Sequence, residues 1–147
     1  MAGRDDAHRL GWLGTGRMGM EMGRRLLEAG CDLSVFNRSM AKAEPLVRMG
    51  AKPAGSAAEL AARDIVFITV GSSDDLVSAV LGPDGLMSGP GAGPRVLVDC
   101  STVSAEASAR VRAEIAEHGT ALLAAPVMGN PKVVRAGKMT AAALRAR

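Results

Sequence analysis

Aromatic residues are nearly absent from this sequence, which contains one tryptophan, two phenylalanines and no tyrosine. Proteins that bind single-stranded nucleic acid stack its bases on aromatic side chains, so we do not expect a partner of this kind. The hydrophobic core must instead be built from aliphatic side chains and from nine methionines. A length of 147 residues, of which 48% are hydrophobic, is sufficient for one globular domain with a sizeable core.

Cysteine and clustered charge are also scarce. Cys31 and Cys100 are too few and too far apart for a disulfide framework or a zinc site, so we expect reduced core thiols and no metal. The net charge is +3, but Arg24 and Arg25 form the only adjacent basic pair, which does not indicate a nucleic-acid-binding surface. Because no apolar run approaches the length of a membrane span and the first ten residues do not form a signal peptide, we expect a cytoplasmic protein that does not bind membranes.

Short apolar segments typical of strands alternate with helical segments along the chain. Strands are expected at residues 9–13, 32–37, 64–70, 95–99 and 120–124. Helices are expected at residues 18–29, 39–49, 74–81 and 104–118, with a short one after Ser56. This alternation predicts an α/β fold, a doubly wound parallel sheet with helices on both faces.

Local signals refine these boundaries. Pro45 falls inside the second helix and predicts a kink or an early break. Ser56 and Glu59 form a capping box, in which each side chain satisfies the other's end amide. The polar residues 1–7 are expected to be a disordered tail, which leaves 8–147 as one domain.

A glycine-rich sequence, GTGRMG, lies between the first expected strand and the first expected helix. The pattern is a weak signal alone, but dinucleotide-binding folds require it at this position. Gly14 would permit the tight turn, Gly16 the close approach of a pyrophosphate, and Gly19 the packing of the helix against the strand. The helix N-terminus would offer N–H groups to the phosphates. The alternative is a glycine turn that serves packing only.

The end of the second expected strand carries Asn37, Arg38 and Ser39, where the dinucleotide fingerprint expects a carboxylate that bonds the adenosine ribose. A carboxylate would repel a 2′-phosphate, whereas these residues supply donors and a positive charge. They therefore predict NADP as the preferred cofactor, with NAD as a possible one. The alternative is that Asn37 and Ser39 only shape the turn and cap the next helix.

These residues, with motifs further along the chain, resemble the β-hydroxyacid dehydrogenases, which include 3-hydroxyisobutyrate dehydrogenases, glyoxylate and succinic semialdehyde reductases and 6-phosphogluconate dehydrogenase. The later motifs are GPDGL at 82–86, DCST at 99–102, APV at 125–127 and AGKMT at 136–140. They follow the family's order from about residue 8 to residue 140. The resemblance implies a Rossmann-type dinucleotide-binding domain of an NAD(P)-dependent oxidoreductase that acts on a small hydroxyacid or semialdehyde.

The resemblance also implies roles for individual residues. Thr15, Arg17 and Met18 would hold the dinucleotide together with the three glycines. Thr102 would contact the cofactor near the nicotinamide, and Ser101 would hydrogen-bond the substrate. Both follow the carboxyl end of a strand, where ligands lie in open α/β sheets, although either could instead cap the next helix. The loop beside the ribose and nicotinamide would be formed by Val70, Gly71 and Ser72.

The family's substrate motif, Asp-Ala-Pro-Val-Ser-Gly-Gly, is altered here to AAPVMGN at residues 124–130. Gly129 could still present its backbone amide to a carboxylate, and Asn130 could add a side-chain donor. Met128 replaces a serine and removes its hydroxyl, so a different carbonyl or imine substrate stays open. The helix expected after Asn130 would expose Val133, Val134 and Met139 if nothing covered them.

In this family a lysine acts as general acid/base, on a helix that leads into a second, all-helical domain. Neither Lys132 nor Lys138 matches that position, so we expect no catalytic residue in this chain. The expected product is the N-terminal domain only, either truncated or one module of a split enzyme whose partner chain supplies the helical domain. The last residues, with Arg145 and Arg147, depart from the family's apolar strand and are expected to be frayed or aberrant. The alternative is a non-catalytic dinucleotide-binding remnant or a redox-sensing module.

Overall fold

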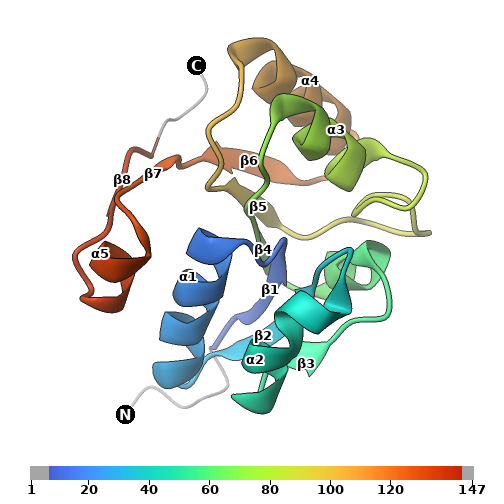
Figure 1. The fold of residues 1–147 in the computed structure, drawn as a ribbon. Coiled ribbons are helices and arrows are strands. Elements are labelled where there is room, and N and C mark those ends of the chain that lie inside the picture. The colour runs from blue at the N-terminus through green and yellow to red at the C-terminus, as the bar shows by residue number, and fades with distance from the viewer. Residues whose placement is uncertain (1–6, 144–147) are drawn as a thin grey trace.

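The computed structural model describes residues 7–143, and the expected N-terminal tail therefore lies, except for Ala7, outside the described residues. Six parallel strands form one sheet in the order β3-β2-β1-β4-β5-β6 (Figure 1). The order reverses between β1 and β4, which is the switch point where open α/β sheets bind ligands. The predicted doubly wound α/β fold is confirmed. The strands are β1 (Arg9–Leu13), β2 (Asp32–Phe36), β3 (Lys52–Pro53), β4 (Ile65–Ile68), β5 (Val96–Asp99) and β6 (Ala121–Ala124).

Helices cover both faces of the sheet, and each layer has its own cluster of buried side chains (Figure 1). The alternation along β4 connects the two clusters, because Val66 and Ile68 pack with α3 and α4 while Ile65 and Phe67 pack with α1 and α2. This explains why β4 is apolar at every position. The helices of the two layers are α1 (Arg17–Glu28), η2 (Met40–Ala43), α2 (Glu44–Arg48), η3 (Ala57–Ala62), α3 (Ser73–Leu81) and α4 (Ala105–Ala116).

The predicted helix at 39–49 is broken as expected, since the 3₁₀ helix η2 ends where α2 begins and Pro45 lies in the first turn of α2. The capping box is only half right. The Ser56 hydroxyl accepts a hydrogen bond from the Glu59 amide, but the Glu59 carboxylate accepts from the amide of Gly55, one residue earlier than predicted. The two-residue strand β3 was not predicted, because two exposed residues carry no periodic signal.

After β6 the chain forms a two-stranded antiparallel sheet, β7 (Val127–Met128) with β8 (Thr140–Ala141), and between them α5 (Pro131–Arg135) packs against α1 (Figure 1). Val134 would be exposed only if nothing covered it, and here it is buried against the α1 layer. An ion pair between Arg135 and Glu21 of α1, 3.4 Å long, also links α5 to α1. Residues 144–147, with the arginines expected to be aberrant, lie outside the described residues. Within residues 7–143, every helix is too short or too polar to cross a bilayer.

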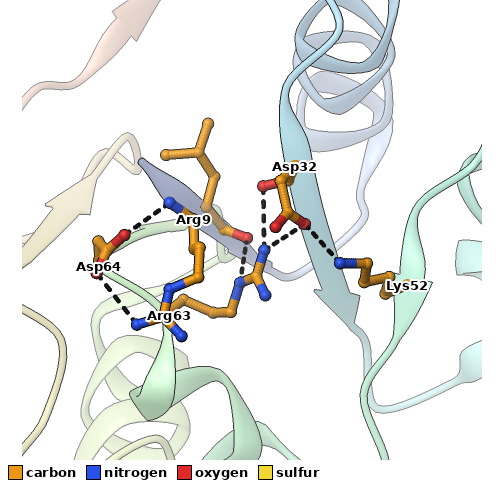
Figure 2. Close-up of polar contacts among 6 residues, drawn as sticks. Arg9, Asp32, Lys52, Arg63 and Asp64 are labelled. Atoms are coloured by element: carbon orange, nitrogen blue, oxygen red, sulfur yellow. Dashed lines mark hydrogen bonds and ion pairs between the residues drawn. The ribbon is translucent and has the colours of Figure 1, made fainter. Parts of the chain in front are cut away.

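At the amino ends of the strands, one arginine joins two neighbouring strands (Figure 2). The Arg63 guanidinium donates to the backbone carbonyls of Leu10 in β1 and Asp32 in β2, at 3.0 and 3.2 Å. It also pairs with the Asp32 carboxylate, which Lys52 of β3 approaches to 3.1 Å. Partial burial raises the pKa of Asp32, but the hydrogen bonds and charges of Lys52 and Arg63 outweigh it and hold the pKa below its ordinary value.

Asp32 is therefore expected to make the stability of the domain depend on acid. A carboxyl whose pKa is lower in the folded than in the unfolded state stabilises the fold above the unfolded-state pKa, and this contribution is lost as the pH falls through the folded-state pKa. We expect Asp32→Asn to lose less unfolding free energy than the wild type between about pH 6 and about pH 3, as measured by urea denaturation. Glu28→Gln, at the exposed end of α1, is the control. An unchanged pH dependence in Asp32→Asn would contradict the role of this ion-pair cluster.

Candidate functional site

The glycine turn at the switch point is fixed by close contact with the end of β4. Gly14 has a φ of 93°, which favours glycine, and a Cβ there would lie 2.1 Å from the carbonyl oxygen of Thr69. The Thr69 hydroxyl donates to the Gly14 carbonyl at 2.7 Å and accepts from the Trp12 indole at 3.2 Å. The Gly14 amide donates to the Phe36 carbonyl of β2 at 3.0 Å. The turn is thus held from both neighbouring strands.

The other two glycines of the motif serve different purposes. A Cβ on Gly19 would lie 2.5 Å from the Thr69 hydroxyl and 2.6 Å from the Gly14 carbonyl, so this glycine lets α1 pack against the turn. A Cβ on Gly16 would meet nothing within 4 Å. The N-cap of α1 is Gly16, which has no side chain, so the first amides of the helix receive no side-chain hydrogen bond. The start of α1 therefore opens into space, with amides available to an anion.

This space belongs to a cleft of about 1110 Å³ along the carboxyl edge of the sheet. The cleft gathers all of the predicted cofactor-binding residues except Ser72 and Thr102, while their roles in binding stay predictions. The substrate-side candidates Ser101, Gly129 and Asn130 are not among its lining residues. The predicted residues that line it are Gly14, Thr15, Gly16, Arg17, Met18, Gly19, Asn37, Arg38, Ser39, Val70 and Gly71.

One buried polar atom in the cleft wall has no hydrogen-bond partner within the described residues. Thr15 is only 4% exposed, and its hydroxyl oxygen makes no hydrogen bond in residues 7–143. A buried hydroxyl without a partner costs on the order of 1–3 kcal/mol, so such an atom at a cleft wall suits a polar ligand. With the uncapped start of α1, this orphaned hydroxyl means that the residues present fit a dinucleotide phosphate.

Asn37 connects the glycine turn with the turn that follows β2. Its side-chain oxygen accepts from the Thr15 amide at 3.1 Å, and its side-chain nitrogen donates to the Ser39 carbonyl at 2.8 Å. The reading of Asn37 as a turn-shaping residue is therefore right in part. Ser39 is the N-cap of η2, but its side chain makes no capping hydrogen bond.

Ser101 joins the loops that follow β4 and β5. Its hydroxyl accepts from the Val70 amide at 2.8 Å, and its own amide donates to the Asp99 carboxylate at 2.9 Å. Burial raises the pKa of Asp99, which is 1% exposed, while hydrogen bonds from Ser101 act in the opposite direction. The suggestion that Ser101 or Thr102 caps the next helix is wrong, because Ser104 caps α4 by accepting from the Ala107 amide.

Two further candidates also have structural roles. The Ser72 hydroxyl caps α3 by accepting from the Asp75 amide at 3.1 Å. The Asn130 side-chain oxygen caps α5 by accepting from the Val133 amide at 3.1 Å. Gly129, beside it, has a φ of 128° and is exposed, so the residue before α5 has a backbone conformation that favours glycine.

The cleft also contains residues to which sequence reasoning assigned no role. Lys42 of η2 adds a third exposed cation to the cleft lining, besides Arg17 and Arg38, and Asp75 and Asp84 contribute carboxylates from α3 and the loop after it. Thr69 contacts the glycine turn directly. A signal for Thr69 was available, because the residue after a strand that neighbours β1 must lie beside the turn that ends β1.

An open parallel sheet with this strand order and a glycine turn at its switch point defines a Rossmann-type dinucleotide-binding domain. Residues 9–143 match a family described as the NAD binding domain of 6-phosphogluconate dehydrogenase, and the chain belongs to that family.

Similar proteins are dehydrogenases and reductases. Glyoxylate/succinic semialdehyde reductase 2 of Arabidopsis thaliana is 35% identical over 88% of this chain and 36% of its own length. The 3-hydroxyisobutyrate dehydrogenase of Pseudomonas aeruginosa is 35% identical over 89% of this chain and 44% of its own. Among solved structures, Psf3 in complex with NADP+ and 2-OPP superposes with a TM-score of 0.81 at 31% identity, over 90% of this chain and 47% of that one. The chain thus spans less than half the length of these relatives.

Two glycine-to-alanine substitutions compare a position where a methyl group would clash with the turn and one where it would enter open space. We expect Gly19→Ala to lower the unfolding free energy by about 1–3 kcal/mol, because its methyl group collides with the turn. Gly16→Ala, whose methyl group enters open space, should cost less than about 1 kcal/mol. Urea denaturation followed by circular dichroism measures both. Equal losses would contradict the separate roles of the two glycines.

Proposed function

We propose that this chain binds NADP(H) in the cleft and presents its nicotinamide to a small hydroxyacid or semialdehyde. The observation that carries the proposal is the uncapped start of α1, which opens into a cleft that Arg38 and Lys42 also line. In this arrangement the pyrophosphate of NADP would lie over Gly16, and its 2′-phosphate would lie beside these two cations. The relatives' names supply the substrate class, since they include a semialdehyde reductase and a hydroxyacid dehydrogenase.

The pyrophosphate would be held by the glycine turn. The first amides of α1 carry the positive end of the helix dipole, and Gly16 leaves room for phosphate oxygens next to the backbone. The Thr15 hydroxyl, which has no hydrogen-bond partner within residues 7–143, would gain one from a phosphate oxygen. Arg17, exposed in the first turn of α1, adds a charge on the same side.

The preference for NADP over NAD is proposed from the residues after β2. The neutral Asn37 occupies the position of the ribose-binding carboxylate, and Arg38 and Lys42 are exposed cations on the cleft wall. A charge-assisted hydrogen bond from a guanidinium to a phosphate is among the stronger polar contacts. The NADP+ bound to Psf3, a structural relative, supports the same assignment.

The bound nicotinamide supplies the hydride chemistry, and the residues of this chain bind and orient it. Val70 and Gly71 line the cleft beyond the glycine turn, and Ser101 fixes the Val70 backbone through its hydroxyl. Ser101, Gly129 and Asn130 are proposed to face the substrate, with Thr102 and Ser72 near the nicotinamide. A proton donor for the carbonyl would come from a further domain or a partner chain.

Titration with NADPH and a turnover assay test this function. We expect NADPH to bind the purified chain and quench the fluorescence of its single tryptophan, which lies next to the glycine turn. NADPH oxidation is then followed with a panel of semialdehydes. Binding without turnover would favour the non-catalytic module, and absence of binding would refute the proposed function.

The charge at residue 38 is expected to set cofactor choice. Arg38→Ala should weaken NADPH binding by about 10- to 100-fold, because a hydrogen bond to a charged group is lost, and should leave NADH binding nearly unchanged. Arg48→Ala, which removes an exposed arginine of α2 outside the cleft, is the matched control. An unchanged ratio of the two affinities in Arg38→Ala would contradict the assignment of the 2′-phosphate site.

A further inference from the structure

We propose that Asn37 is a positioning residue, which acts by holding the glycine turn and the Arg38–Ser39 turn at a fixed separation rather than by binding the ribose. Asn37 would affect the choice between NADPH and NADH indirectly, by fixing the position of Arg38. The inference rests on the proposed NADP site and assigns within it a role different from the one expected from the sequence, where Asn37 was counted as a direct ligand.

The side chain of Asn37 is already engaged at both ends. Its oxygen accepts from the Thr15 amide, and its nitrogen donates to the Ser39 carbonyl. Only one orientation of the carboxamide allows both hydrogen bonds, because the flipped group would set donor against donor and acceptor against acceptor. Each of the two polar atoms thus makes one hydrogen bond to a backbone group, and these two groups belong to different turns.

This bridge begins where the backbone pairing of the two strands ends. The paired register of β1 and β2 runs to Leu13 opposite Phe36, and one further backbone bond joins the Gly14 amide to the Phe36 carbonyl. Beyond that point, among the hydrogen bonds of the described residues, the Asn37 side chain continues the connection between the two turns. It thereby continues the hydrogen-bonded connection between the ends of β1 and β2 as far as the residues that line the cleft.

The need for two complementary atoms explains why asparagine occupies this position. An aspartate would keep the bond from the Thr15 amide, but its second oxygen would face the Ser39 carbonyl and repel it. The neutral amide is therefore required by these contacts within the protein. It also avoids the electrostatic repulsion between a carboxylate and a 2′-phosphate. Arg38 is exposed and lies between the two anchored residues, Asn37 and Ser39, so its direction depends on this bridge.

A double-mutant cycle between residues 37 and 38 tests the inference. Affinities for NADPH and NADH are measured by quenching of Trp12 in the full chain, in Asn37→Ala, in Arg38→Ala and in the double variant. We expect Asn37→Ala to weaken NADPH binding about 10-fold more than NADH binding, and we expect this difference to vanish when Arg38 is already absent. Asn37→Ser is run in parallel, and urea denaturation verifies that each variant is folded.

The control is Thr120→Val, which removes a buried side-chain hydrogen bond to the Pro94 carbonyl outside the cleft and should leave the ratio of affinities unchanged. Equal losses of NADPH and NADH affinity, persisting without Arg38, would overturn the inference and make Asn37 a direct ribose ligand. If the wild-type chain binds neither cofactor, the proposed function itself fails. These two failures are therefore distinguishable.

Discussion

The contact between the end of β4 and the glycine turn is the constraint on which the site depends. The Thr69 hydroxyl accepts a hydrogen bond from the Trp12 indole and donates one to the Gly14 carbonyl. Thr69 also occupies the space that a Cβ on Gly14 or Gly19 would enter. Because β1 and β4 are the neighbouring strands at the switch point of the sheet, this contact ties the topology to the turn. The start of α1 points into the cleft as a result.

Side chains link the loops that follow β2, β1, β4 and β5 in the same manner. Asn37 joins the turns after β1 and β2, Thr69 those after β1 and β4, and Ser101 those after β4 and β5. Each uses a short polar side chain to satisfy a backbone group of a neighbouring loop, where strand pairing no longer does so. At the opposite edge, Arg63 performs this task with one long side chain. The cleft is accordingly built from loops that hydrogen bonds join to one another.

The sequence predicted those features that depend on local pattern. Apolar runs located the five longer strands, and the glycine spacing predicted the tight turn at Gly14 and the close packing at Gly19. The role of Gly16 beside a phosphate stays a prediction. The partners of Asn37 and Ser101 could not be predicted in this way, because they lie 22 and 31 residues away along the chain and meet only through the strand order. The two-residue strand β3 falls below the length at which periodicity is informative. Helices were expected where η2 and η3 lie, but the sequence pattern did not indicate that they would be 3₁₀ helices.

The unpaired hydroxyl of Thr15 has an energetic consequence for the whole domain. A buried hydroxyl without any hydrogen-bond partner carries a desolvation cost, and the Thr15 hydroxyl has no partner among residues 7–143. In the proposed complex, a ligand atom that bonded this hydroxyl would remove that cost, and the recovered free energy would contribute to the affinity. In the proposed function, cofactor binding and the stability of the domain would thus be linked through this one oxygen atom.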